Sequence, residues 1–345
     1  MDIFSISYDL IVVGAGPAGS SAARVAAEAG ASVLLLEQKA RIGSPVQCAE
    51  FVPAKLAKVV TIEPRHTARR IRSMKVYLPD GQRREREMAE PGYMLNRELF
   101  DRDLAGAAWL AGAKLAVATK VTAINPEGVT VKNSDGCFDI KASVIIGADG
   151  PYSMVGKYIG QINSCYLRSV QCEAVWDQAG DSIECYFDSV YEGGYAWVFP
   201  KETTANIGVC CRQQPVKALQ HFLGELGLGR ERIVGWRGGM LPAGGPLPVT
   251  VKGNCLLVGD AAGQLLPLTW EGIRCAIVCG MVAGKFAAEA ALSGDLTRLQ
   301  GYQERWQSLF LPQMEAGIAK HRYLLENWST DAQILTQLLE TTCTI

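Results

Sequence analysis

Four short, mostly apolar runs predict buried strands along the chain, at residues 10–13, 32–36, 144–146 and 254–258. Each run is too short for a helix and is bounded by glycine or polar residues, as buried strands are. The first run leads through a glycine-rich turn into an Ala-rich stretch that predicts a helix. Strand, helix and second strand together predict a βαβ unit near the start of the chain.

Other patterns indicate a different kind of structure. Residues 74–78 and 83–88 flank Pro79-Asp80-Gly81 and predict a hairpin. Residues 156–240 hold short runs rich in Tyr, Trp, Cys and Val with few helical patterns, which indicates a mainly antiparallel region. Further predicted elements are a helix at 99–110 that starts at Asn96 and ends at Gly112, strands at 113–117 and 129–132, a turn at Asp135-Gly136, and helices within 296–345.

The first βαβ unit carries the most informative motif, Gly14-x-Gly16-x-x-Gly19. Gly14 permits the tight turn, Gly16 lets a pyrophosphate approach the backbone, and Gly19 lets helix and strand pack closely. The second strand ends in Glu37, about twenty residues downstream, where a ribose hydroxyl needs an acceptor. The motif therefore predicts that the chain binds an adenine dinucleotide.

Two later segments extend the predicted cofactor site. Gly259-Asp260-Ala261-Ala262-Gly263 follows a buried strand, and its carboxylate can accept hydrogen bonds from a ribityl chain. Gly272-Ile273 opens a helix whose N–H groups and dipole can stabilise a reduced flavin. Asp149-Gly150 ends another buried strand. These elements in order indicate FAD, because NAD alone needs only the first.

The predicted fold is α/β: a Rossmann-like FAD-binding domain, an interleaved and mainly antiparallel substrate domain, and a short helical C-terminal tail. The FAD-binding domain is discontinuous because the substrate domain is inserted into it. We assign residues 1–72, 93–155 and 241–295 to the FAD-binding domain, 73–92 and 156–240 to the substrate domain, and 296–345 to the tail.

Composition narrows the function. A net charge of -1 over 345 residues gives no global field that recruits nucleic acid. Because the first strand begins near residue 8, we expect no signal or transit peptide. The apolar stretch 273–292 is broken by charged residues, which favours a buried helix over a membrane span. The 11 cysteines are scattered without a C-x-x-C pair, and His66, His221 and His321 lie far apart, so we expect no metal site and a reduced, cytoplasmic setting.

At residues 8–290 the chain resembles the geranylgeranyl reductase family, within the flavoproteins folded like p-hydroxybenzoate hydroxylase. The resemblance rests on Gly43-Ser44-Pro45-Val46-Gln47-Cys48-Ala49-Glu50, Asn96-Arg97-Glu98-Leu99-Phe100-Asp101, Tyr195-Ala196-Trp197-Val198-Phe199-Pro200-Lys201, and 259–263 with 267–273. It implies a flavin-side Cys48, a flavin-side Arg97 and a substrate motif at Tyr195, Trp197 and Phe199. It departs from the family at Trp270, where a small residue is usual, and at the early end of the chain, which lacks most of the C-terminal domain of longer members.

The predicted site residues follow from the motifs and this resemblance. Catalytic candidates are Cys48, Tyr195, Trp197 and Phe199. Cofactor-binding candidates are Gly14, Gly16, Ala18, Gly19, Glu37, Gln38, Cys48, Arg97, Asp149, Gly150, Asp260, Gly263, Gly272 and Ile273.

Several of these residues have a structural interpretation as well. Tyr195, Trp197 and Phe199 alternate on a strand and share one face, either as a cavity wall or as core. Cys48 is either a buried small hydrophobe or a group beside the flavin. Glu50 is either a solvated charge or a proton source.

Two surface features leave membrane contact open. Residues 65–86 carry eight Lys or Arg against Asp80 and Glu85, which is either a solvated hairpin face or a patch for anionic lipid headgroups. Apolar tail residues recur at helical spacing and either pack on the body or meet a membrane. They are Trp306, Leu309, Phe310, Leu311, Tyr323, Leu324, Leu325 and Trp328.

The resemblance implies an FAD-dependent oxidoreductase that reduces C=C bonds of an isoprenoid or other apolar, lipid-like substrate. The electron donor is NAD(P)H or a ferredoxin, because no second G-x-G-x-x-G unit is visible. The alternatives are a flavin-dependent monooxygenase or halogenase on the same scaffold, and a non-catalytic prenyl-binding carrier. We expect no nucleic-acid partner and a cytoplasmic protein, with peripheral membrane contact as an option.

Overall fold

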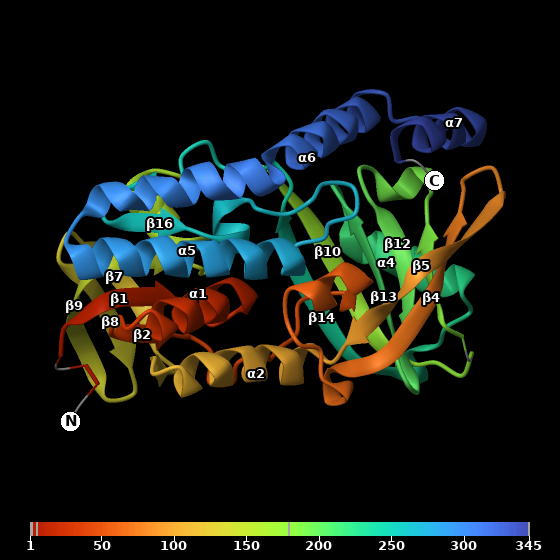
Figure 1. The fold of residues 1–345 in the computed structure, drawn as a ribbon. Helices are drawn as coiled ribbons and strands as arrows, with labels where there is room; N and C mark the ends of the chain where they lie inside the picture. Colours follow the sequence, from red (N-terminus) through yellow and green to blue (C-terminus); the bar gives the residue numbers. More distant parts are fainter. Residues whose placement is uncertain (1–2, 5, 179, 344–345) are drawn as a thin grey trace.

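A computed structural model describes residues 3–4, 6–178 and 180–343 and contains two eight-stranded sheets. Figure 1 shows them side by side, with α1, α2, α5 and the first part of α6 over the first sheet, and the end of α6 with α7 over the second. The predicted α/β class with an antiparallel part is confirmed.

The first sheet holds the predicted βαβ unit. Its main path is β15-β16-β9-β1-β2-β6, parallel from β16 to β6, while β7 and β8 form an antiparallel meander with β9. The strands are β1 (Tyr8–Val13), β2 (Val33–Leu36), β6 (Lys114–Ala116), β7 (Lys120–Asn125), β8 (Gly128–Asn133), β9 (Gly136–Gly147), β15 (Val251–Lys252) and β16 (Cys255–Leu257).

Both faces of this sheet are buried, which explains the continuous apolar runs. Leu10 and Val12 pack toward the helices α1 (Pro17–Glu28) and α5 (Ile273–Ser293). Ile11 and Val13 pack on the other face, with β8 and with α3 (Met154–Ile159). The four predicted buried strands are β1, β2, β16 and the end of β9.

Helix α5 is long and apolar enough, by length and composition, to cross a membrane. More than half of its most apolar window, 56 %, is buried in the protein. It packs along α1 so closely that a Cβ on Gly280 would lie 2.2 Å from the Ala18 carbonyl oxygen, and one on Gly284 the same distance from the Ala22 oxygen. We therefore describe α5 as a core helix.

The second sheet carries the predicted aromatic motif. Its order is β14-β10-β13-β12-β11-β4-β5-β3, and only the β4–β11 pair is parallel among its described strands. Helix α4 (Pro215–Glu225) covers one face, and residues 49–51 with Trp270 pack on the other. The strands are β3 (Phe51–Val52), β4 (Thr67–Tyr77), β5 (Arg83–Leu95), β10 (Tyr166–Val175), β11 (Ser182–Tyr186), β12 (Tyr195–Pro200), β13 (Thr204–Cys211) and β14 (Ile233–Pro242).

The hairpin is longer than the sequence predicts. β4 and β5 extend beyond residues 73–92 in both directions, because their pairing continues to Thr67 and Leu95 and β5 also pairs with β3. The helix α2 (Arg97–Leu110) then starts directly after β5, with Asn96 as its cap. The division of the chain into domains at the stated boundaries stays a prediction.

Two helices form the tail, α6 (Gln300–Glu326) and α7 (Ala332–Cys343). Trp306 and Phe310 are buried against the first sheet's helical side, whereas Leu309 and Tyr323 are exposed. Leu335 and Leu339 of α7 pack with Val76 and Leu78 at the tip of the β4–β5 hairpin. Most of the apolar tail therefore packs on the body.

The basic residues of the hairpin are largely paired. Arg65, Arg72 and Arg84 form ion pairs with Asp103, Asp181 and Glu340. Further partners are Glu184 for Lys75, Glu85 for Arg83, the Tyr93 ring for Arg70 and three backbone carbonyls for Arg69. These contacts favour the interpretation as a solvated hairpin face.

Candidate active site

The glycine-rich turn forms as its motif predicts. Gly14 has φ +101°, and a Cβ there would lie 2.4 Å from the Ala148 carbonyl oxygen. A Cβ on Gly19 would lie 1.9 Å from the Gly14 oxygen, so both positions need glycine for close packing. A Cβ on Gly16 would meet nothing within 4 Å. Open space in front of Gly16, at the start of α1, fits an approaching pyrophosphate.

Glu37 is oriented toward this turn. One of its carboxylate oxygens accepts a hydrogen bond from the Ala15 N–H at 3.0 Å, and the other accepts one from the Lys39 N–H at 2.9 Å. A carboxylate has about four acceptor positions, so capacity for two ribose hydroxyls remains. Gln38, beside it, is exposed.

Asp149 has a structural role that the sequence did not reveal. Its carboxylate accepts hydrogen bonds from the Ser153 hydroxyl at 2.5 Å and the Met154 N–H at 2.6 Å, at the start of α3. Burial raises the pKa of Asp149, and these hydrogen bonds oppose that shift. Gly150 follows with φ +78°. Contact of either residue with FAD stays a prediction.

Asp260 differs from Asp149 because no described residue donates a hydrogen bond to its carboxylate. Burial raises the pKa of Asp260 to about 6, and the charge of Arg97 acts in the opposite direction. A Cβ on Gly272 would lie 3.7 Å from Asp260 Oδ1, which places the carboxylate beside the start of α5 at Ile273. An oriented acceptor without a partner fits the hydroxyl groups of a ribityl chain.

Tight contacts bring these segments together. A Cβ on Gly259 would lie 3.0 Å from the Cβ of Ala18, at the start of α1. Gly263 has φ +68°, and a Cβ there would lie 2.2 Å from the Gly245 carbonyl oxygen. The glycine-rich turn, Asp260 and the start of α5 therefore line one cradle, and their donors and acceptors fit FAD.

Cys48 and Arg97 lie next to this cradle. The Arg97 guanidinium donates hydrogen bonds to both carboxylate oxygens of Asp101, at 2.9 and 2.8 Å. Burial raises the pKa of Cys48, while the nearby charge of Arg97 lowers it. Because its ordinary value of 9.0 already lies above neutrality, Cys48 is a protonated thiol at pH 7.

The aromatic residues of β12 share one face, as alternation predicts. Trp197 lies between Tyr195 and Phe199, with ring centroids 6.1 Å from each. All three belong to an apolar cluster on the inner face of the second sheet, which Phe51 and Trp270 also contact. Trp270 packs edge-on against His321 of α6, with centroids 5.0 Å apart, and so covers one side of this cluster.

A buried polar cluster beside the aromatic row was missed by the sequence analysis. Glu50 is only 1 % exposed and accepts hydrogen bonds from the Arg97 N–H (3.1 Å), the Asn206 amide (2.7 Å) and the Lys201 ammonium (3.0 Å). Its interpretation as a solvated charge is therefore wrong, because both carboxylate oxygens are engaged inside the protein. Arg237 pairs with Glu173 at 2.6 Å and completes the cluster.

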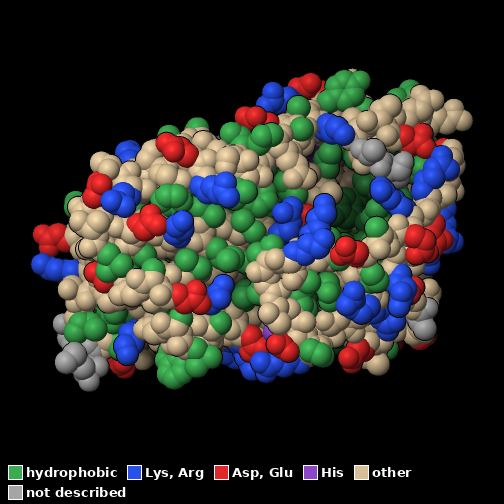
Figure 2. All heavy atoms as spheres, viewed as in Figure 1, with side chains coloured by type: hydrophobic (Ala, Val, Ile, Leu, Met, Phe, Trp, Pro, Cys, Tyr) green, Lys and Arg blue, Asp and Glu red, His purple; other side chains and the backbone are tan. Residues whose placement is uncertain are grey.

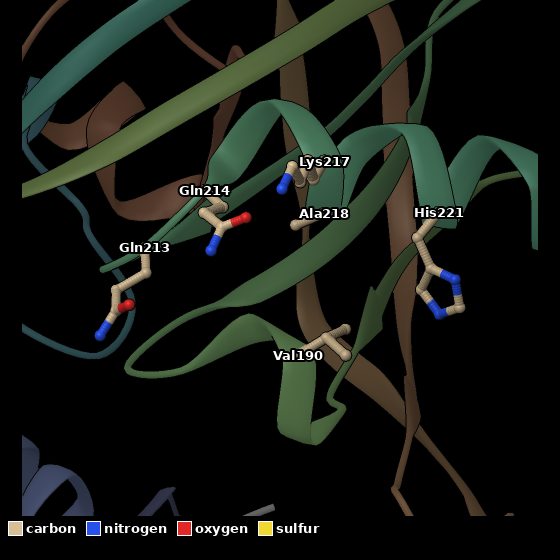
Figure 3. A pocket seen from close by; sticks show the side chains of 6 residues that line it. All are labelled: Val190, Gln213, Gln214, Lys217, Ala218 and His221. Atoms are coloured by element: carbon tan, nitrogen blue, oxygen red, sulfur yellow. The ribbon is translucent and has the colours of Figure 1, made fainter.

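Two hollows lie at the second sheet, and one of them adjoins these groups. One of about 290 Å³ lies at α4, lined by Val190, Gln213, Gln214, Lys217, Ala218 and His221 (Figure 3). It is remote from the cradle, because α4 covers the opposite face of the second sheet. The other, about 240 Å³, lies between that sheet and α6 and is lined by Cys165, Tyr166, Leu167, Arg212, Ala243, His321, Arg322, Leu325 and Glu326.

The second hollow adjoins the aromatic cluster, since Leu167 and Ala243 belong to both. Figure 2 shows the molecule hollowed below α6 and α7, with hydrophobic side chains inside and Lys and Arg side chains around the opening.

Among the described residues, no group of three or more His, Cys, Asp or Glu side chains could hold a metal ion.

Comparisons with known proteins support the binding of FAD. The family described as FAD dependent oxidoreductase matches residues 9–151. A digeranylgeranylglycerophospholipid reductase of Methanothrix thermoacetophila is 37 % identical over 92 % of this chain and 86 % of its own.

Solved structures extend the likeness to the whole fold. A geranylgeranyl bacteriochlorophyll reductase-like protein of Thermoplasma acidophilum is 26 % identical, with a TM-score of 0.85 over 98 % of this chain and 96 % of its own. A probable FAD-dependent monooxygenase of Pseudomonas aeruginosa is 19 % identical with a TM-score of 0.71, over 97 % of this chain and 100 % of its own, and shares the fold alone.

Proposed function

Because this chain belongs to the digeranylgeranylglycerophospholipid reductase family and is an FAD-dependent oxidoreductase, we propose that it reduces C=C bonds in the isoprenoid chains of a glycerophospholipid. One observation carries the proposal. Cys48 packs with Ile273 at the start of α5, while its neighbour Ala49 packs in the aromatic cluster of β12. Trp270, two residues before Gly272, belongs to the same cluster, so a cofactor in the cradle and an alkyl chain on the aromatic row can lie against each other.

The residues of this junction have distinct tasks in the proposed reaction. FAD supplies the hydride when bound and reduced. Tyr195, Trp197 and Phe199 hold the chain in an apolar, water-poor cavity, which aligns a weakly electrophilic alkene. Cys48 keeps its proton at neutral pH and so presents an S–H group, not a thiolate, to the cavity. Arg97 fixes the position of the Cys48 loop through its N–H bond to Glu50.

The hollow between the second sheet and α6 is the proposed entrance for the lipid. Its inner wall is apolar and continues into the aromatic cluster, while Arg212 and Arg322 line it nearer the surface. Arg322 is exposed there and suits an anionic headgroup, whereas Arg212 already pairs with Glu192 at 3.0 Å and Glu326 also lines the hollow. A membrane-bound substrate calls for peripheral membrane contact. The electron donor, NAD(P)H or a ferredoxin, and the cytoplasmic location stay predictions.

An anaerobic turnover experiment tests the function. The purified protein is reduced with dithionite, and the flavin spectrum is followed as an unsaturated isoprenoid phospholipid is added. Reoxidation with a product heavier by one pair of hydrogens per reduced bond is the expected result. The matched control is the same lipid with saturated chains, which must leave the flavin reduced.

The alternative enzymes give a different result in this experiment. A monooxygenase or halogenase would stay reduced with the lipid and form a hydroperoxyflavin band once oxygen enters. A protein that purifies colourless and takes up no FAD would be a carrier.

A further inference from the structure

Four buried polar atoms on the inner face of the second sheet have no hydrogen-bond partner among the described residues. They are Gln171 Oε1, Trp197 Nε1, Asn206 Oδ1 and Arg237 Nη1. Leaving such atoms without a hydrogen bond destabilises the folded protein, so native proteins rarely do so. Two of the four are acceptors and two are donors.

The orientation of both amides is fixed by their neighbours. The Gln171 amide nitrogen donates to the Cys48 carbonyl oxygen at 2.8 Å. The Asn206 amide nitrogen donates to the Ala49 carbonyl and to Glu50 Oε2, at 3.1 and 2.7 Å. If either side-chain amide were rotated by half a turn, its oxygen would face the carbonyl or carboxylate oxygen that its nitrogen now donates to. Their oxygens are therefore the atoms left unpaired.

Strand register places the four side chains together. Arg237 on β14 lies opposite Gln171, and Gln171 lies opposite Gly208, which in turn lies opposite Trp197. Gly208 has no side chain to separate them: a Cβ there would lie 2.4 Å from Trp197 Cζ2 and 2.6 Å from Gln171 Cβ. Asn206 is two residues along the same strand and so faces the same side.

The charged side chains around these four atoms add up to a net charge of zero. Glu50 and Glu173 are matched by Lys201 and Arg237. A balanced site with two donors and two acceptors that lack hydrogen-bond partners suits a small neutral molecule that both donates and accepts, and water is the smallest of these. Glu50 is buried, but the side chains of Glu173, Lys201 and Arg237 are 16, 15 and 22 % exposed, so the cluster reaches solvent at its rim.

We propose that Gln171, Trp197, Asn206 and Arg237 hold a short chain of ordered water that carries the proton for alkene reduction from the solvent-facing Lys201–Glu173 rim to the cavity beside Trp197. This inference rests on the proposed function. One alkene carbon receives a hydride from the reduced flavin, and the other receives a proton from the innermost water. That water regains a proton along the chain from solvent, so the C=C bond becomes a CH–CH bond and the flavin is oxidised.

The water site is tested by crystallography, independently of activity. In crystals of the protein with and without FAD, ordered water is expected within about 3.2 Å of at least two of the four atoms. A dry site, or one whose four atoms bond to protein or to FAD, overturns the proposal.

The proton route is tested with Gln171→Met, which keeps the length of the side chain, and Trp197→Phe, which keeps an aromatic ring; each removes one of the four unpaired atoms. Single turnovers of reduced enzyme with lipid are measured in H₂O and D₂O. Removing a positioned proton carrier slows such a step by about tenfold or more, and the solvent isotope effect should increase in both variants. Flavin absorbance and reduction by dithionite should not change.

Gln47→Met is the matched control, because it removes a similar bond between the same loop and sheet, Gln47 Nε2 to the Gly238 carbonyl, and none of the four atoms. If all three variants keep the wild-type rate and isotope effect, or if Gln47→Met behaves like the other two, the proton route is wrong. If the wild-type protein fails to reduce the lipid at all, the proposed function is wrong, and the crystallographic test of the water site still stands.

Discussion

The buried carboxylate of Asp260, which we propose binds FAD, destabilises the folded protein at neutral pH when FAD is absent. This carboxylate is desolvated and has no donor among the described residues, which raises its pKa from 3.8 to about 6. The folded protein without FAD therefore binds an extra proton between these pH values. Stability must fall as pH rises through that window, because the unfolded chain releases the proton more easily.

Asp260→Asn should remove this dependence. Without FAD, wild-type stability should fall between about pH 4 and pH 6 relative to the variant, since the amide has no charge to desolvate. FAD affinity should drop about 10- to 100-fold, the equivalent of one hydrogen bond to a charged acceptor. Urea unfolding across this pH range and FAD titration measure the two effects. Parallel stability curves for variant and wild type would contradict the assignment.

At the scale of elements, the α1–α5 pair supports the cofactor cradle. Gly280 and Gly284 let α5 rest on the backbone of α1, and the contact with Gly280 is at Ala18, in the first turn that faces the proposed pyrophosphate. The packing of α5 on α1 and the proposed binding of the pyrophosphate therefore both depend on the first turn of α1.

Gly280→Ala should therefore weaken both. The added methyl meets the Ala18 carbonyl oxygen and must push the helices apart, which costs about 1–3 kcal/mol of unfolding free energy and lowers FAD affinity. Gly224→Ala in α4 is the control, because its Cβ would meet nothing within 4 Å and alanine favours a helix by about 1 kcal/mol. Thermal unfolding with and without FAD compares them; equal behaviour of the two variants would refute the packing argument.

Across the whole molecule, Glu50 connects the cofactor side to the second sheet. It accepts hydrogen bonds from the Arg97 N–H at the start of α2, from Lys201 directly after β12 and from Asn206 on β13. Both partners and the carboxylate are largely buried, so removing one charge leaves another unpaired.

Glu50→Gln should lower the free energy of unfolding by about 3–5 kcal/mol, as for other broken buried pairs. Glu127→Gln breaks the exposed Lys141–Glu127 pair and should change it by less than about 1 kcal/mol. Urea denaturation measures both. A small and equal effect in the two variants would show that the buried cluster does not hold the two sheets together.

Features that depend on residues close together in the sequence could be predicted, whereas contacts between distant segments could not. Gly14, Gly16 and Gly19 were predictable because their steric roles lie within one turn, and buried strands such as β1 were predictable from their apolar runs. The partners of Glu50 were not, because Lys201, Asn206 and Arg237 meet it only through strand register. The available signal for this cluster was the pair Gln171 and Glu173, two polar residues among the otherwise apolar residues 170–175 of β10. Asp149 was predicted for the cofactor from its position after a strand, but its bonds to α3 depend on the following loop.

The contact between α7 and the β4–β5 hairpin has a consequence during protein synthesis. Val76 and Leu78 are buried by Leu335 and Leu339, which are translated much later. At 5–20 residues per second, the hairpin tip waits on the order of 10–50 s on the ribosome before its cover exists. Val76 and Leu78 thus form an exposed apolar edge on every nascent chain, and a chaperone that binds such edges would find it there.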